Sequence, residues 1–236
     1  MKKLLLVVVV ALMASPAQLS AKTKKKNKGV DTTLVSKLKT DDWSRAVKGA
    51  RKMDGMFPVY LNSKDGKLYF ELADSLMGRD YILANRVAQT SNTHDYVAGQ
   101  MVDRPQLVRF TRDSTKVMLH LVQNGNVVKE GDPIAASFNS NFADPVLKGF
   151  KITAQRPGKV LIDVTSFFGS NEKSISPIKS DNPLSVIFGG SRSLKGSFQS
   201  DASGISVVKN FPRNIEIKTL LTFTLSNNDK PYSVLM

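Results

Sequence analysis

The chain of 236 residues contains no cysteine, only two histidines and a single tryptophan. It therefore has no disulfide bond, no thiolate metal ligand and no cysteine nucleophile. Small exported domains often use disulfides to compensate for a thin hydrophobic core, so this chain has to rely on apolar burial instead. Its hydrophobic content of 41% is typical of a folded protein and too high for a disordered one.

Long apolar runs are also lacking, and the longest one lies at the N-terminus. Two lysines precede ten apolar residues (4–13), which are too few to span a bilayer. Small residues follow, and sequences ending at Ala17 and at Ala21 both fit a signal-peptidase site. We expect residues 1–21 to be a signal peptide and the protein to be exported: periplasmic, associated with the outer membrane or secreted. No transmembrane segment is expected.

The net charge of +14 is concentrated near the N-terminus. Two lysines belong to the expected signal peptide and five more lie between residues 22 and 28, which leaves about +7 on the remaining chain. We interpret residues 22–30 as a basic disordered linker and expect no nucleic-acid partner. Contact of this linker with anionic phosphates or lipopolysaccharide is the alternative.

The hydrophobic period divides the chain into a helical beginning and a β-rich body. Apolar residues recur at helical spacing over residues 31–53, and Trp43 is expected to pack this helix on a sheet. From Met56 onward the period is two, and the turn NSKDG joins two alternating runs into a hairpin. Further strands are predicted at 81–89, 106–111, 116–122, 150–154, 159–164, 205–209 and 215–225.

No helical segment recurs between these strands, which argues against parallel βαβ units. The predicted fold class is α+β, mostly antiparallel β, with a helical N-terminal segment followed by a β-rich body. We divide the chain into a small helix-plus-hairpin domain (31–86) and a β-rich domain (87–236). Because an alternating strand begins at Tyr232 and stops within its pattern, we expect the second domain to be incomplete and to expose an apolar strand edge.

Metal binding is not expected. The two histidines, His94 and His120, are 26 positions apart, whereas an H-E-x-x-H element needs two imidazoles one helical turn apart. We expect His94 to be a solvated loop residue and His120 to be a hydrogen-bonded structural residue in a strand.

Nucleophilic catalysis is not expected either, so no catalytic, cofactor-binding or metal site is assigned. The chain lacks a G-x-S-x-G elbow. S-x-x-K occurs at Ser170 and Ser176, followed by Ser180-Asp181-Asn182, but the elements of serine-lysine enzymes come from separate parts of the fold and here share one loop. A hydrolase acting through one of these three serines is the weakest hypothesis.

Three other features favour structural roles. The glycine-rich basic stretch 188–197 could nest an anion but lacks the G-x-x-x-x-G-K-[ST] pattern, and we interpret it as a loop. Asp163 and Glu216 alternate with apolar neighbours and are expected to face solvent or pair across strands. An inward Asp163 that caps the following turn is the alternative.

Several segments, taken together, resemble a known family. These are GMFPVY, DGKLYFELADSLMGRDYILANRV, GQMVDRPQLVRF, SFNSNFADPVLKGFKITA, VLIDVTSFFGSN and SVVKNFPRNIEIKTLLTF. They resemble, in order, the N-terminal domains (domain of unknown function 5118, then part of 5117) of exported zinc-dependent metallopeptidases of Bacteroidota. The resemblance covers most of residues 43–225. It implies a peptidase domain with a zinc-binding H-E-x-x-H motif after these two domains, and no such motif occurs in the 236 residues.

The resemblance implies a non-catalytic N-terminal region that scaffolds or shields a peptidase domain, with zinc held outside this chain. The chain is then a fragment, part of a split gene or a degenerate paralogue, and its partner is a peptidase domain or a polypeptide substrate. Whether the chain belongs to an active enzyme stays open. The alternative is a stand-alone envelope module that binds peptides or polyanions through strand edges or the loop around Arg192 and Lys195.

Overall fold

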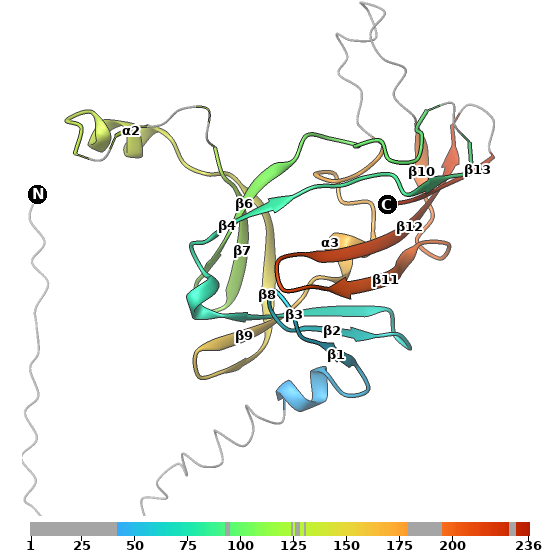
Figure 1. The fold of residues 1–236 in the computed structure, drawn as a ribbon, viewed down its shortest axis with the longest axis horizontal. Helices are drawn as coiled ribbons and strands as arrows, with labels where there is room; N and C mark the ends of the chain where they lie inside the picture. Colours follow the sequence, from blue (N-terminus) through green and yellow to red (C-terminus); the bar gives the residue numbers. More distant parts are fainter. Residues whose placement is uncertain are drawn as a thin grey trace, which may run out of the picture.

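The computed structural model describes residues 42–92, 95–123, 125, 128–129, 131–178, 195–226 and 230–236. Within them the chain is β-rich, and every strand pair is antiparallel, as predicted. The strands form two sheets (Figure 1). No helix in the described part of the chain is long and apolar enough to cross a membrane.

The larger sheet has eight strands in the order β1-β2-β3-β9-β8-β7-β6-β4. The predicted hairpin at its start is confirmed, with Val59 opposite Phe70 and Leu61 opposite Leu68. In chain order the strands are β1 (Arg51–Met53), β2 (Val59–Asn62), β3 (Lys67–Ala73), β4 (Asp80–Leu83), β6 (Gln106–Arg112), β7 (Lys116–Leu121), β8 (Val146–Arg156) and β9 (Lys159–Asp163).

The smaller sheet has the order β10-β12-β13-β5, with β11 also paired to β12. Its strands are β5 (Gln89–Thr90), β10 (Gly196–Phe198), β11 (Gly204–Asn210), β12 (Ile215–Leu225) and β13 (Pro231–Leu235). The expected apolar edge at the end of the chain is wrong. β13 pairs with β12 on one side and with β5 on the other, and the side chains of Tyr232 and Val234 are fully buried.

Helices are few and short. Residues 42–46 are helical, and Asp74–Leu76 (η1), Ala135–Asn141 (α2) and Thr165–Gly169 (α3) follow. Residues 31–41 of the predicted helix 31–53 lie outside the described residues, and the last part of the prediction is wrong, because Arg51–Met53 forms β1. Gly49 explains the change, since its φ of 76° is a left-handed conformation that ends a helix.

The predicted packing role of Trp43 is confirmed. Its side chain is 2% exposed and lies on the outer face of the larger sheet with Tyr60, Tyr69 and Leu161. Arg156 and Lys159 place their cations 4.8 Å and 5.5 Å from the centroid of the indole ring. The helical turn at residues 42–46 is therefore held to the sheet by aromatic and cation–π contacts.

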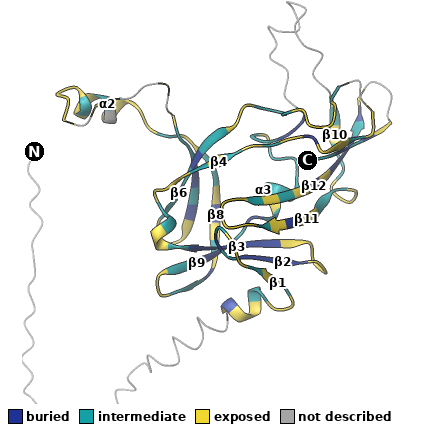
Figure 2. Cartoon of the chain, in the orientation of Figure 1, coloured by how far each residue is buried: buried dark blue, intermediate teal, exposed yellow. Residues whose placement is uncertain are grey.

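The main core lies on the inner face of the larger sheet and contains alternate side chains from six of its strands. Figure 2 shows buried positions along the strands of this sheet. Phe167 and Phe168 of α3 enter this core, and their rings pack against Phe150 and Phe70 respectively. The hairpin β11–β12 adds Val208 from the opposite side. Burial of these side chains, at about 25 cal/mol per Å² of apolar surface, is the main force that holds the layers together.

β12 belongs to two cores. Ile215 and Ile217 in its first half pack on the main core, whereas Leu221 and Phe223 in its second half form a second core with Tyr232 and others. The smaller sheet is thereby fixed to the larger one by a continuous strand. The side chains of the second core come from Val87, Leu221, Phe223, Leu225, Tyr232 and Val234.

Asn210 connects the end of β11 to the β1–β2 loop. Its side-chain oxygen accepts a hydrogen bond from the Met56 N–H at 3.2 Å, and its amide donates to the carbonyl oxygens of Met53 and Phe57 at 2.9 and 2.8 Å. Gly55 makes this approach possible, because a Cβ there would lie 2.3 Å from the Asn210 side-chain oxygen. Gly55 therefore permits a close contact between the layers.

We expect Gly55→Ala to lower the free energy of unfolding by about 2 kcal/mol, since the new methyl group displaces the Asn210 amide and strains the junction. Urea denaturation measures the change. Gly149→Ala is the matched control, because a Cβ at Gly149 meets nothing within 4 Å. Equal stability of the two variants would contradict this role of Gly55.

Candidate functional site

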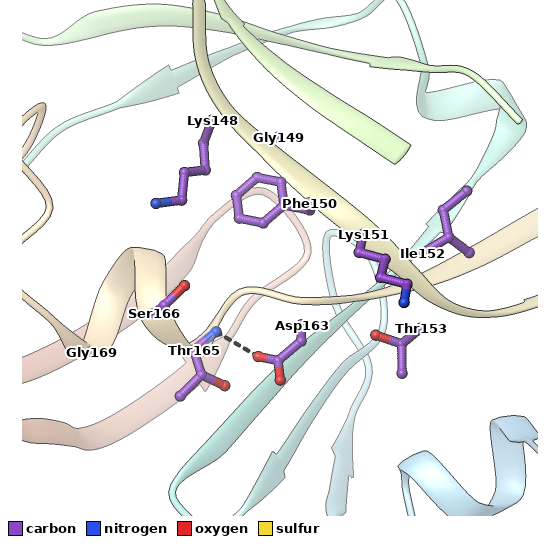
Figure 3. A pocket seen from close by; sticks show the side chains of 10 residues that line it. All are labelled: Lys148, Gly149, Phe150, Lys151, Ile152, Thr153, Asp163, Thr165, Ser166 and Gly169. Carbon is purple, nitrogen blue, oxygen red and sulfur yellow. Dashed lines mark hydrogen bonds between the residues drawn. The ribbon is translucent and has the colours of Figure 1, made fainter. Parts of the chain in front are cut away.

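An open cleft of about 710 Å³ lies between β8 and α3 (Figure 3). One wall is β8 from Lys148 to Thr153, and the other is formed by Asp163, Thr165, Ser166 and Gly169. The lining mixes two ammonium groups, hydroxyls, one carboxylate and the Phe150 ring. This composition is suited to a polar ligand that also offers an apolar surface.

The cleft exists because β8 separates from β9. The ladder between them runs from Arg156↔Lys159 to Ile152↔Ile162, with a register shift between Ile152 and Ala154, and then ends. From Val146 to Lys151 the strand pairs only with β7. The edge of β8 that faces α3 thus has no strand partner there among the described residues.

Asp163 fixes the wall opposite β8. Its Oδ1 accepts a hydrogen bond from the Thr165 N–H at 2.9 Å, which is the turn-capping alternative left open by the sequence. Thr165 Oγ1 in turn accepts the Leu68 N–H at 2.8 Å and so ties the first turn of α3 to β3. These bonds hold the hydroxyl-bearing face of α3 in a fixed position beside the cleft.

The two lysines of the cleft differ in their contacts. Lys148 Nζ lies 2.8 Å from Glu172 Oε2 in a half-buried ion pair. The Lys151 ammonium is exposed and has no hydrogen-bond or ion-pair partner within the described structure, and the Ser166 hydroxyl has none either. Lys151 and Ser166 therefore have free capacity to bind a ligand.

A second polar cluster lies on the outer face of the larger sheet. Glu71 is 7% exposed, and its carboxylate accepts hydrogen bonds from the Tyr60 hydroxyl and from Lys159 Nζ, each at 2.6 Å. Burial, together with the hydrogen bond to Glu71 and its negative charge, raises the pKa of Tyr60 to about 12. The three polar groups pair with one another and Lys159 also contacts the Trp43 ring, so we assign this cluster a role in stabilising the sheet.

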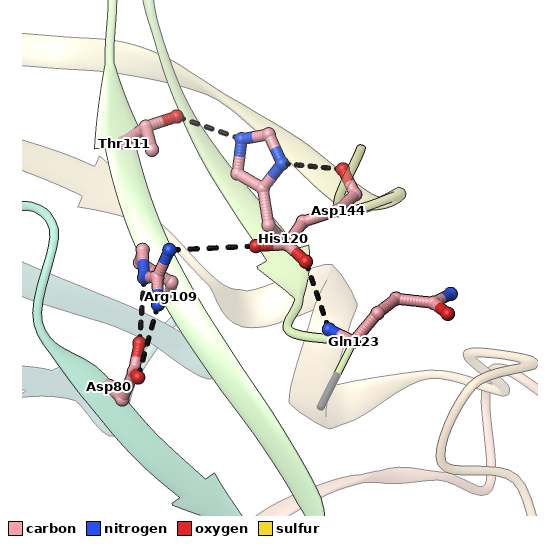
Figure 4. Close-up of polar contacts among 6 residues, drawn as sticks. All are labelled: Asp80, Arg109, Thr111, His120, Gln123 and Asp144. Carbon is pink, nitrogen blue, oxygen red and sulfur yellow. Dashed lines mark hydrogen bonds and ion pairs between the residues drawn. The ribbon is translucent and has the colours of Figure 1, made fainter. Parts of the chain in front are cut away.

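A third cluster surrounds His120 (Figure 4). Its Nδ1 lies 3.1 Å from the carbonyl oxygen of Asp144, which can only accept, so Nδ1 donates a proton. Nε2 then accepts from the Thr111 hydroxyl at 2.9 Å. The expected structural role of His120 is confirmed by these two hydrogen bonds, whereas His94 lies outside the described residues.

Arg109 bridges two carboxylates in the same region. It donates to both oxygens of Asp80 at 2.7 and 3.1 Å, and its other terminal nitrogen lies 3.5 Å from Asp144 Oδ2. The hydrogen bond from Arg109 lowers the pKa of Asp80. The Gln123 N–H also donates to Asp144 at 2.9 Å. The cluster therefore links β4, β6 and the segment that follows β7 through their side chains.

The serines singled out by the sequence do not form a catalytic arrangement in the described residues. Ser170 Oγ donates to the Ser166 carbonyl oxygen at 2.6 Å. Ser176 is 1% exposed and contacts the side chain of Asn171, and its Oγ donates to the Ile178 carbonyl oxygen at 2.9 Å. Both are turn-forming contacts, while Ser180 and Lys179 lie outside the described part.

The glycine-rich stretch 188–197 is described only from residue 195 onward, so Arg192 is not among the described residues. Gly196 has a packing role, since a Cβ there would lie 2.7 Å from the Thr224 carbonyl oxygen. Glu216 is exposed on β12, in agreement with its expected solvent-facing position. No group of three or more histidine, aspartate or glutamate side chains that could hold a metal ion occurs among the described residues.

Of the residues that line the cleft, sequence reasoning singled out only Asp163. Gly149 could have drawn attention to this segment. It lies within β8, next to Lys148 and two residues before Lys151. A glycine inside a strand weakens it and often marks an irregularity or a site of close approach. Chemically, the arrangement offers a strand edge, a cation and hydroxyl groups. It can bind and orient a polypeptide.

Comparison with protein families gives a definite placement. A family model described as Domain of unknown function (DUF5117) matches residues 99–236, and one described as Domain of unknown function (DUF5118) matches residues 44–90. The first match covers more than half of the chain, so the chain belongs to the DUF5117 family. No curated protein and no solved structure matches it. Each matched segment contributes strands to both sheets, because β3 and β5 of the first segment pair with β9 and β13 of the second.

We expect part of the stability of the folded protein to disappear at alkaline pH because of Tyr60. Its pKa is raised from 10.0 to about 12, so the neutral phenol is favoured in the folded state. The resulting stabilisation is complete below pH 10 and is lost as the pH rises through 12. Ultraviolet difference titration of the wild type against Tyr60→Phe should isolate a phenol that ionises near pH 12, and its ionisation at the ordinary value would contradict the burial described.

We expect Asp163→Ala to lower the free energy of unfolding by about 1 kcal/mol, because the Thr165 N–H loses its acceptor. Asp163→Asn is the matched control, since an amide oxygen can still accept this hydrogen bond. Urea midpoints of the three proteins provide the measurement. An asparagine variant as unstable as the alanine variant would show that the negative charge, and not the turn, is what matters.

Proposed function

We propose that this member of the DUF5117 family is the non-catalytic N-terminal region of an exported zinc-dependent metallopeptidase-like protein of Bacteroidota. In this proposal the region scaffolds or shields a peptidase domain, or presents a polypeptide substrate to it. The catalytic zinc would be held by that peptidase domain and not by the residues described above.

The cleft between β8 and α3 is the observation that carries the proposal. It combines an unpaired strand edge with a free ammonium group at Lys151 and a free hydroxyl at Ser166, which are the groups that recognise main-chain amides and carboxylates. The walls are fixed by the core around Phe150 and Phe167 and by the bonds of Thr165. A rigid cleft of this kind loses little conformational entropy when a polypeptide binds.

The family placement supports the same conclusion independently of the cleft. The two matched domains follow each other in the order, 5118 and then 5117, that the resemblance to exported metallopeptidases implies. The signal-peptide pattern at residues 1–21 favours export.

A stand-alone envelope module for peptides or polyanions is the second candidate. The observation that favours it is the presence of Lys148 and Lys151 on the same cleft wall, together with the net positive charge of the chain. Binding of a polyanion depends steeply on ionic strength. Retention of the chain on immobilised lipopolysaccharide at low salt, lost at high salt and in Lys151→Glu, would favour this candidate.

The first test concerns the peptidase domain. We expect the DNA downstream of the codon for Met236 to encode, in frame or after a frameshift, a segment with H-E-x-x-H. Expressed with a tag that does not bind metal, that domain should co-purify with the chain, and chelator-sensitive proteolysis should require the domain. Stoichiometric zinc and chelator-sensitive proteolysis by the 236-residue chain alone would overturn the proposal.

A further inference from the structure

We propose that the cleft binds one extended polypeptide segment as an additional β-strand along β8, with an acidic side chain of that segment opposite Lys151. The inference rests on the proposed function, because it names the ligand of the same cleft. It goes further because it assigns binding to main-chain hydrogen bonds, and it assigns the preference for an acidic segment to the Lys151 ammonium group.

The direction of the main-chain groups on β8 supports strand addition. The Ile152 N–H donates to the Thr115 carbonyl oxygen on the β7 side at 3.1 Å. In an antiparallel ladder these groups alternate between the two edges of a strand. The N–H and C=O groups of Gly149 therefore point to the other edge, toward α3, beyond the end of the ladder with β9.

The free edge is also accessible. Gly149 is exposed, and a Cβ built on it meets no atom within 4 Å. An added strand lies about 4.8 Å from its neighbour, and the cleft of about 710 Å³ separates this edge from α3. Unpaired main-chain groups at such an edge are a template for another strand.

The charges of the cleft select among possible segments. Glu172 neutralises Lys148, and Asp163 uses one oxygen for the Thr165 N–H. Lys151 is left with an ammonium that has no partner in the described structure. A carboxylate in the bound segment pairs with it. Since an exposed ion pair changes affinity only several-fold, main-chain hydrogen bonds provide most of the affinity, and Lys151 provides the preference for an acidic segment.

Fluorescence anisotropy with a designed peptide tests this mode. The probe is a short fluorescein-labelled peptide of alternating threonine and valine with one central glutamate. We expect saturable binding to the full chain, and loss of binding by a version with alternate amides N-methylated, which cannot form a ladder. Gly149→Leu, which adds a bulky side chain to the strand segment that lines the cleft, should weaken binding by about tenfold or more.

Charge exchange provides the second arm. Lys151→Glu should weaken binding of the glutamate peptide several-fold and strengthen that of the peptide in which lysine replaces glutamate. Lys218→Glu, an equal charge change at an exposed position of β12, is the matched control and should leave both affinities unchanged. If circular dichroism shows that Gly149→Leu does not fold, the Lys151→Glu variant and the N-methylated peptide test the inference without it.

Three outcomes would overturn the inference: no saturable binding at low salt, equal binding of the N-methylated peptide, or affinities unaffected by Gly149→Leu and Lys151→Glu. If one of these outcomes occurs while the peptidase domain still co-purifies with the chain, the inference fails and the proposed function stands. If the peptide binds as expected and no peptidase domain associates, the cleft is a peptide site of a stand-alone module, and the proposed function fails instead.

Discussion

The path of β8 is the constraint on which the rest of the structure depends. This strand of eleven residues pairs with β7 over its first half and with β9 over its second half, and a register shift lies where the partners change. A register shift of this type bends a strand and increases its local twist. The bend joins the β4–β6–β7 part of the larger sheet to the β9–β3–β2–β1 part (Figure 1). The cleft beside α3 lies on the segment of β8 that β9 does not cover.

The core explains why the cleft keeps its shape. Phe150 on β8 packs edge-on against Phe167 of α3, with ring centroids 5.8 Å apart, so the two walls share one buried contact at the base of the cleft. β12 holds the smaller sheet against the same core through Ile215 and Ile217. The strand edge is therefore presented by a packed scaffold and does not depend on a loop for its position.

The polar groups are of two kinds: some have hydrogen-bond or ion-pair partners within the protein, and others have none in the described structure. Glu71, His120 and Arg109 each have their hydrogen-bonding partners within the sheet, and their arrangement stabilises strand pairing. Lys151 and Ser166 face the cleft without partners in the described structure. This contrast is the reason for assigning binding to the cleft and a structural role to the other clusters. It is also consistent with a region that holds a polypeptide while a separate domain supplies the chemistry.

The sequence by itself determined the local structure. Alternation of apolar residues fixed the β2–β3 hairpin and most other strands, and the isolated Trp43 marked a packing position, because both signals arise from neighbours along the chain. Only the tertiary structure decided that β3 lies beside β9, that β13 is an inner strand and that Arg51–Met53 extends the sheet. These pairings join residues far apart in sequence, and their register depends on the twist and bend of the complete sheet. Gly149 and Lys151 were visible in the sequence, but their role as a strand edge arises only where β8 leaves β9.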